Sequence, residues 1–279
     1  MTIFKIFSTK YFGPVYPSLK SVIKLLISTV LIYTLERLKL HLMNPIKMRF
    51  LGLSLLFYFF LISAKAQIES GVYFSEYGNT IHELKISDDY LIHSVYEKKP
   101  AAFVRTVGGF YKVDENNLEL ALEFNSDFEI NGVSELTIPY KVEDGNLILN
   151  ADDNLIFEPR VTNDQDLDGQ WLFATRGPDE GQERRGEANS RKTLKFLKDG
   201  RFQWIAYDTD GMQFKGTGGG SYTSKDGMYT ENIEYFSRDN SRVGASLDFN
   251  YEVKGADWHH TGKNSKGEPL YEIWGRREK

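Results

Sequence analysis

Short runs in which apolar and polar residues alternate, separated by turn-forming residues, fill the chain from residue 70 to its end. Successive side chains of a strand point to opposite faces, so this alternation predicts strands with one buried and one solvated face. It is clearest where Leu247, Phe249 and Tyr251 alternate with polar residues. The predicted strands cover residues 71–76, 82–87, 90–96, 102–112, 117–124, 133–142, 146–149 and 154–158, and then 169–175, 193–197, 201–208, 213–223, 228–235, 243–253, 257–261 and 270–277.

The connections between these strands are short and rich in Asp, Asn and Gly, as in residues 87–89 and 143–146. Short connections join antiparallel neighbours. Eight such strands are expected to close on themselves, because closure removes exposed strand edges. The sequence therefore predicts an all-β protein with two tandem antiparallel eight-stranded barrels, in residues 67–160 and 169–279. The polar residues 161–168 are the predicted linker, which we expect to carry few contacts.

The two predicted barrels also share a sequence repeat. Residues 90–146 align without a gap on residues 201–257, a shift of 111 positions. Most of the matches are glycines and aromatic residues, which indicates an internal duplication. The matched pairs include Tyr96 and Tyr207, Phe103 and Phe214, Gly108-Gly109 and Gly219-Gly220, Tyr111 and Tyr222, Glu123 and Glu234, and Tyr140 and Tyr251.

Residues 43–66 have the three regions of a secretory signal peptide: basic Lys47 and Arg49, an apolar run over residues 50–62, and Ala-Lys-Ala at residues 64–66. The alternative is a membrane anchor, but the run is shorter than the roughly 20 residues that a spanning helix needs. We expect cleavage before Gln67 and a secreted or periplasmic protein. Residues 1–42 are interpreted as an upstream extension produced by the choice of start codon, with a membrane-associated extension as the alternative.

Composition narrows the chemistry further. The chain has no cysteine, which excludes disulfides, thiolate metal sites and a cysteine nucleophile. Removing residues 1–66 takes away nine Lys or Arg and one Glu, so the net charge goes from −5 to −13. Nucleic acid is not an expected partner at that charge, since such binding depends on neutralising phosphates with Lys and Arg.

The second unit opens with Gly-x-Trp at residues 169–171, has a long polar first loop at residues 176–191 and closes on a strand with a late arginine. These features resemble the lipocalin-like (calycin-type) domains of bacterial secreted proteins. The resemblance implies that Trp171 packs beside Arg277 or Arg276 as a structural plug, with Tyr73 and Arg160 in the equivalent places of the first unit. It also implies that the long loop is part of a lid; a disordered insertion is the alternative.

From these features we expect a non-enzymatic protein whose second barrel binds a small apolar or amphipathic molecule. The alternative is a structural or protein-interaction module with barrels filled by side chains. Glu231 and His259 are the expected polar groups of the site, although a twisted strand would instead carry Glu231 to solvent. The predicted ligand-binding residues are Phe196, Phe202, Trp204, Phe214, Tyr222, Glu231, Phe249, Tyr251 and His259.

Other motifs give little support to catalysis. The Gly-rich residues 216–220 precede a strand rather than a helix, so they do not form a phosphate loop, and we expect them to bend a strand or to lie beneath a large ring such as that of Trp204. His259 and His260 are strand neighbours and face opposite sides. A haem or metal protein that uses His259 remains the third class, but no second ligand stands at ligand spacing. We therefore expect no cofactor and no metal, and no Ser-His-Asp set is apparent.

Overall fold

The structure is a computed structural model that describes residues 29, 31–33, 68–114, 116–150, 154–264 and 266–277. The predicted signal peptide lies outside the described residues, and so does all of residues 1–42 except four helical positions. Within the described ranges, no helix combines the length and the hydropathy required to cross a bilayer. Residues 66–279 form one compact unit.

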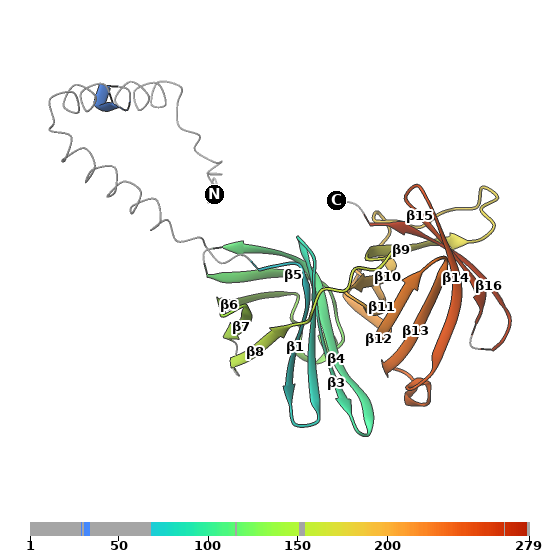
Figure 1. The fold of residues 1–279 in the computed structure, drawn as a ribbon, viewed down its shortest axis with the longest axis horizontal. Helices are drawn as coiled ribbons and strands as arrows, with labels where there is room; N and C mark the ends of the chain where they lie inside the picture. The colour runs from blue at the N-terminus through green and yellow to red at the C-terminus, as the bar shows by residue number, and fades with distance from the viewer. Residues whose placement is uncertain are drawn as a thin grey trace, which may run out of the picture. The chain divides into compact units, whose positions relative to one another are not determined.

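This unit consists of two closed barrels of eight antiparallel strands each (Figure 1). In each barrel the strands pair in sequence order and the last pairs back to the first. The first barrel contains β1 (Gly71–Tyr77), β2 (Thr80–Ile86), β3 (Tyr90–Lys98), β4 (Ala101–Asp114), β5 (Asn117–Asn125), β6 (Glu135–Glu143), β7 (Asn146–Asn150) and β8 (Asn154–Pro159). The second contains β9 (Gly169–Arg176), β10 (Arg191–Lys198), β11 (Arg201–Asp208), β12 (Gln213–Lys225), β13 (Met228–Phe236), β14 (Ser246–Lys254), β15 (Asp257–Lys263) and β16 (Pro269–Arg276).

The predicted fold class is confirmed, and every predicted strand overlaps an observed one. Two short helical turns were not predicted: α3 (Phe128–Asn131) after β5 and the 3₁₀ turn η1 (Asn240–Arg242) after β13. Both lie between the fifth and sixth strands of their barrels. A single turn of this length carries too little hydrophobic periodicity to be recognised from the sequence.

The internal duplication extends to the hydrogen bonds of the backbone. The register shifts between Val95 and Tyr96 in β3, and at the equivalent point in β11. The backbone N–H of Thr106 donates to Ser126 Oγ at 2.9 Å, and the backbone N–H of the equivalent Thr217 donates to Ser237 Oγ at 2.9 Å. The two barrels are therefore repeats in their irregular features as well as in their strand count.

The paired glycines mark a second shared bulge. The register of β4 against β5 shifts between Gly108 and Gly109, and that of β12 against β13 shifts between Gly219 and Gly220. A Cβ atom on Gly109 would overlap the backbone of Ala121, and one on Gly219 would overlap the ring of Tyr235. Both expected uses of these glycines occur: the register shifts lie at Gly108-Gly109 and Gly219-Gly220, and the indole of Trp204 lies against Gly218.

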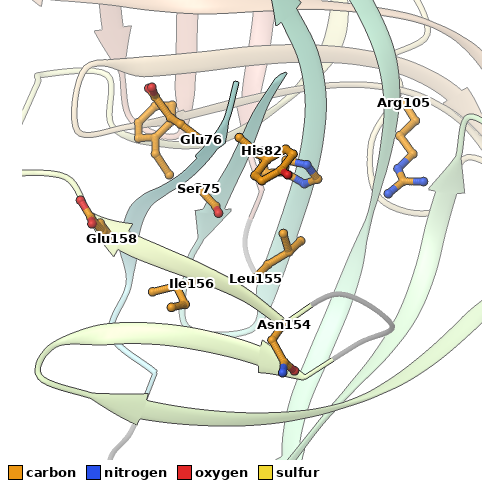
Figure 2. Close-up of a pocket in the computed structure, with 10 residues that line it drawn as sticks. Ser75, Glu76, His82, Arg105, Asn154, Leu155, Ile156 and Glu158 are labelled. Carbon is orange, nitrogen blue, oxygen red and sulfur yellow. The ribbon is translucent and has the colours of Figure 1, made fainter. Parts of the chain in front are cut away.

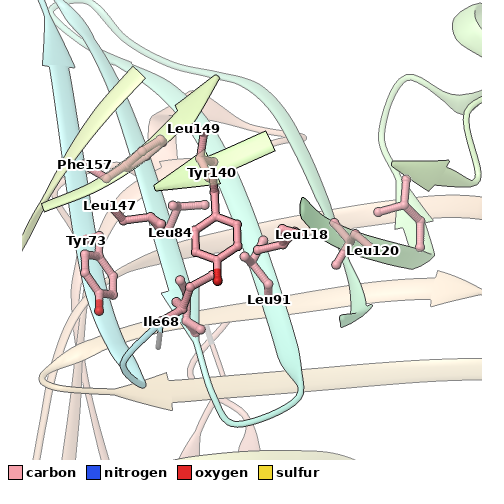
Figure 3. Close-up of a cluster of buried hydrophobic side chains, with 12 residues drawn as sticks. Ile68, Tyr73, Leu84, Leu91, Leu118, Leu120, Tyr140, Leu147, Leu149 and Phe157 are labelled. Carbon is pink, nitrogen blue, oxygen red and sulfur yellow. The ribbon is translucent and has the colours of Figure 1, made fainter. Parts of the chain in front are cut away.

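The interior of the first barrel is aliphatic. Leucines from β2, β3, β5 and β7 meet the aromatic rings of Tyr73, Tyr140 and Phe157 (Figure 3). All three rings are buried. Burial of this apolar set supplies the main stabilisation of the barrel, because each fully buried large side chain contributes about 1.5–3 kcal/mol.

A separate apolar cluster joins the outer faces of the two barrels. The rings of Phe103 and Phe214, which are equivalent residues of the repeat, stack with centroids 6.1 Å apart. Each barrel thus offers the same part of its repeat to the other, in the manner of a two-fold dimer interface. The cluster contains Tyr90, Ile92 and Phe124 of the first barrel with Leu172, Leu194, Phe196, Ile205, Tyr207 and Phe214 of the second.

Charged and polar side chains complete this interface. Arg201 of β11 donates to Glu83 of β2 at 2.9 Å and to Glu234 at 2.5 Å. Gln203 accepts from Ser94 at 2.8 Å and donates to Thr106 and Thr217. Burial acts to raise the pKa of Glu83, but the charges of Arg201 and Lys85 lower it to about 2. These buried groups satisfy one another across the two barrels, so the barrels are held by specific contacts and not only by the linker.

The linker, residues 161–168, makes more contacts with the second barrel than we expected. Leu167 is completely buried in the core of the second barrel, and its backbone N–H donates to Ser224 Oγ at 3.0 Å. Asp168 accepts from the Tyr222 hydroxyl, and Gln165 accepts from the backbone N–H of Ser224. The expectation was wrong because a polar segment without periodicity can still be anchored by side-chain hydrogen bonds.

Candidate functional site

The structure places most of the residues predicted to bind a ligand inside the second barrel. Phe202, Tyr222 and Phe249 are buried there, and Trp204 and Tyr251 pack against the same cluster. The same cluster contains Trp258 and Trp274, which were not among the predicted site residues and whose ring centroids are 6.0 Å apart. Tyr229 also belongs to the cluster, between Phe249 and Trp258.

Three predicted site residues lie elsewhere. Phe196 and Phe214 belong to the apolar cluster between the barrels, since the ring of Phe196 contacts Tyr90. His259 faces the outside, where its Nδ1 lies 2.9 Å from the Tyr271 hydroxyl, while His260 points inward. The prediction of an inward His259 was wrong because alternation separates two strand neighbours without saying which of them faces inward.

A buried ion pair lies among the rings of the second barrel. Lys195 Nζ is 2.7 Å from Glu231 Oε1, and the Tyr229 hydroxyl donates to the same oxygen at 2.7 Å. The ammonium group also lies about 5 Å from the ring centres of Trp258 and Trp274. Glu231 is 5% exposed, so the alternative in which it reaches solvent is wrong. Its partner could not be found from the sequence, because Lys195 belongs to a different strand.

His260 lies beside this ion pair with neither ring nitrogen in a hydrogen bond to the described residues. Its Nδ1 is 3.6 Å from Glu272 Oε2, beyond hydrogen-bond length, and the Trp258 indole N–H also has no partner there. Burial, followed by the charge of Lys195, lowers the pKa of His260, so the ring is neutral at neutral pH.

In the second barrel Trp171 packs beside Arg276, one of the two arginines that the resemblance allowed. Trp171 is fully buried and its indole N–H donates to the Leu167 carbonyl at 2.9 Å. Arg276, paired with Trp171 in the register, lies over the indole ring at 4.2 Å. Arg277 points the other way and binds Glu123 of the first barrel at 2.8 Å. Of the two arginines that the sequence allowed, Arg276 therefore covers the tryptophan, since strand neighbours face opposite sides.

The equivalent plug of the first barrel is incomplete. Tyr73 is buried, and its hydroxyl donates to the Glu69 carbonyl at 2.8 Å, four residues earlier, as Trp171 does to Leu167. Arg160, however, lies over the ring of Phe74 at 5.8 Å. The predicted pairing of Tyr73 with Arg160 was wrong. Only the tyrosine occupies the position equivalent to that of Trp171.

The long first loop of the second barrel, between β9 and β10, carries ordered contacts. Arg184 donates to both oxygens of Asp257, and the guanidinium of Arg185 lies 4.5 Å from the ring centre of Phe173. Glu187 accepts from Arg277 at 2.7 Å. These contacts tie the loop to β9, to β15 and to the residue that follows β16, which does not match a disordered insertion.

The first barrel has an opening that the sequence did not indicate. β1 and β8 pair at Tyr73–Pro159 and Phe74–Glu158, and the backbone N–H of Arg160 donates to the Val72 carbonyl at 2.7 Å. No register pair joins residues 75–77 of β1 to residues 154–157 of β8. A partly enclosed pocket of about 1190 Å³ lies at this opening. Figure 2 shows Ser75 and His82 on one side of it and the β8 residues Leu155 and Ile156 on the other. Its lining residues are Phe74, Ser75, Glu76, Tyr77, His82, Arg105, Asn154, Leu155, Ile156 and Glu158.

Two histidines that are separate in the sequence meet at this pocket. His82 Nδ1 and His93 Nε2 are 3.2 Å apart, and the two rings stack with centroids 5.3 Å apart. Burial, followed by the positive charges of His82 and Arg105, lowers the pKa of His93 to about 3. Alternation on adjacent strands could have placed both side chains on the inner face, but not their contact.

One acidic cluster lies at the base of the second barrel. Carboxylate oxygens of Asp164, Asp168 and Asp199 lie within 4.8 Å of one another. Asp168 already accepts from the Tyr222 hydroxyl, and Asp199 accepts from the backbone N–H of Asn163. The cluster therefore has a structural explanation in the anchoring of the linker.

In comparisons with known proteins, no family model matches the chain and no curated protein matches it. The class of this protein is therefore defined by its fold. The chain is an all-β protein with two closed eight-stranded antiparallel barrels related by internal duplication. Such barrels either enclose a ligand site or are filled by side chains.

Proposed function

We propose that this protein is a secreted, non-enzymatic, lipocalin-like binding protein that takes up a small amphipathic molecule. The observation that carries the proposal is the pocket of about 1190 Å³ at the opening between β1 and β8. This volume lies slightly above the range of roughly 300–1,000 Å³ that is usual for small-molecule sites. The first barrel, rather than the second, is therefore the proposed ligand site.

The lining of this pocket suits a molecule with a polar head and an apolar tail. Phe74, Leu155 and Ile156 offer apolar surface, and Arg105 and His82 offer hydrogen-bond donors. Figure 2 shows Arg105 and His82 across the pocket from Leu155 and Ile156. Ile156 and Tyr77 are more than half exposed at the rim although they are large apolar residues. A bound tail would cover this surface, which is the main source of affinity in such sites.

For the second barrel, we propose the alternative of an interior filled by side chains. Trp258 contacts both Trp171 and Tyr229, with ring centroids 5.7 and 5.1 Å away, and the ion pair of Lys195 and Glu231 lies beside Tyr229 and Trp258. Its outer face carries the interface with the first barrel. We propose that the second barrel supports the first and does not hold the ligand.

The positions of the tryptophans provide a test. All four, Trp171, Trp204, Trp258 and Trp274, belong to the second barrel. Dodecanoate is titrated into the protein, with binding followed by calorimetry and by tryptophan emission. Binding with almost unchanged emission is the expected result. Quenching that disappears in Trp204→Phe would place the ligand in the second barrel instead.

Matched variants locate the site independently of fluorescence. Ile156→Asp introduces a charge at the pocket and is expected to weaken dodecanoate binding about tenfold or more, because an apolar tail would have to desolvate the carboxylate. Val253→Asp, at a comparably exposed position of the second barrel, should leave it unchanged. If dodecanoate, a bile salt and a quinone all fail to bind, the binding proposal is overturned and side-chain-filled barrels remain.

The proposed localisation is tested on the native protein. Mass analysis of the mature N-terminus is expected to find Gln67, as the Ala-Lys-Ala sequence of residues 64–66 indicates. An intact segment beginning at Met1 or Met43 in a membrane fraction would contradict it.

A further inference from the structure

We propose that His82 and His93 form a binding site for a divalent transition-metal ion, Zn²⁺ in particular, at the wall of the first-barrel pocket. The two imidazoles come from adjacent strands, β2 and β3, and their nearest nitrogens are 3.2 Å apart. A tetrahedral zinc ion with nitrogen ligands at about 2.0–2.1 Å holds two such nitrogens about 3.3 Å apart. The observed spacing is therefore close to that of two ligands of one metal.

The surroundings of the pair agree with this chemistry. Imidazole nitrogen is a preferred ligand of zinc, provided that it is unprotonated. His82 lines the pocket, so an ion has access from solvent. Such a site does not depend on uptake of an amphipathic molecule, so it is tested independently of the proposed function.

The remaining coordination positions are not filled by protein carboxylates. Among the described residues, no Asp or Glu stands with the two histidines at the spacing of a three-ligand group. Of the nearby acids, Glu76 pairs with Lys98 at 2.6 Å. Water or a bound solute would therefore complete the coordination, as in metal sites that keep open positions.

The competing explanation is a hydrogen bond between two neutral imidazoles, one of which donates its N–H to the other. The two explanations differ in their response to charge. Arg105 lines the same pocket as His82, so its positive charge opposes the binding of a cation there. Removing that charge in Arg105→Gln should tighten zinc binding, whereas a pair that is only hydrogen-bonded would bind no zinc in either protein.

The experiment is a calorimetric titration of untagged, metal-free full-length protein with Zn²⁺ alone. One equivalent is expected to bind. His82→Ala and His93→Ala are each expected to weaken binding more than about tenfold, since changes outside the ligand shell alone cost about 10–100-fold. The control is His259→Ala, which removes a histidine on the outer face of the second barrel and should leave binding unchanged.

A second measurement on the unaltered protein covers the case in which a histidine variant fails to fold. Zinc binding is expected to shift the ¹⁵N resonances of His82 and His93 and to leave those of His259 in place. Absence of saturable binding at millimolar zinc, binding that persists in both histidine variants, or unchanged resonances of the two rings would each overturn the site.

Discussion

At the residue scale, the second barrel depends on a few side chains whose partners come from other strands. Trp171 combines complete burial with a hydrogen bond to Leu167 and a guanidinium over its ring. Lys195 and Glu231 form an ion pair in which each side chain is 7% exposed. Replacing one such side chain by itself strongly destabilises the fold, because it leaves a cavity or an unpaired buried charge.

Replacement of the plug tryptophan tests its contribution to stability. Trp171→Ala is expected to lower the free energy of unfolding by about 3–5 kcal/mol, the usual cost of truncating a buried aromatic side chain. Urea denaturation measures the loss. Val253→Ala, at a position 42% exposed in the same barrel, is the control and should be close to neutral. A loss below about 1 kcal/mol would show that Trp171 is not the plug.

The ion pair is tested by single and double replacement. Lys195→Met leaves Glu231 buried with only the Tyr229 hydroxyl and is expected to cost about 3–5 kcal/mol. The double variant Lys195→Met with Glu231→Leu should recover most of that loss, since no charge remains in the interior. Thermal denaturation of the three proteins gives the comparison. Equal losses in the single and double variants would mean that the pair is effectively solvated.

At the element scale, the two barrels owe their shape to bulges at equivalent places. Gly109 and Gly220 follow the register shifts in β4 and β12, where the facing strand comes too close for a side chain. A bulge bends and twists its strand, which a barrel requires at its corners. The sequence repeat preserves these glycines because the backbone leaves no room for another residue.

A glycine replacement tests this constraint. Gly109→Ala would bring a Cβ atom onto the carbonyl of Ala121, so the strands must move apart. The expected cost is about 1–3 kcal/mol, as for other overpacked sites. Gly186→Ala, in a loop where nothing lies within 4 Å of the added atom, is the matched control. Urea denaturation should separate the two variants; equal midpoints would contradict the steric explanation.

At the scale of the whole molecule, the interface between the barrels is the main feature that links the repeats. Glu123 of the first barrel accepts hydrogen bonds from Tyr207 and Arg277 of the second. Burial acts to raise the pKa of Glu123, but Arg277 and the tyrosine hydroxyls lower it below its ordinary value. The fold thus favours the charged carboxylate, so this group links stability to pH.

The sign of that link gives a prediction. A carboxylate with a lowered pKa in the fold contributes its full stabilisation above the unfolded pKa, about 4.3, and loses it as the pH falls toward the folded value. Glu123→Gln should therefore be less stable than the native protein at pH 7, and the difference should shrink below pH 4. Urea midpoints measured between pH 2 and 7 test this. A difference independent of pH would exclude ionisation as its cause.

Separation of the barrels tests the interface as a whole. Residues 161–279 expressed alone would expose Ile205 and Tyr207, together with Arg201, which loses its partner Glu83. We expect this fragment to self-associate or to melt at a lower temperature than the intact protein, and residues 67–160 to restore the melting temperature when added. Ultracentrifugation and calorimetry measure both effects. A monomeric fragment with unchanged stability would show that the interface contributes little.

Local patterns in the sequence determined the strands, their order, the closure of both barrels and the duplication. These features depend on neighbours along the chain, namely alternation, turn residues and a repeated spacing, which is why they could be predicted. A signal for the interface was also present: Tyr90, Leu91 and Ile92 are apolar on both faces of their strand, which is typical of strands covered on both sides.

Only the tertiary structure decided which side chains meet. Alternation assigns residues to two faces but does not say whether a face points into the barrel or toward the other barrel, so Phe196 and His259 were placed on the wrong side. The contacts of Lys195 with Glu231 and of His82 with His93 join different strands, and strand pairing fixes such distances only after folding. The pocket likewise arises where β1 and β8 part, a matter of barrel geometry that no local pattern encodes.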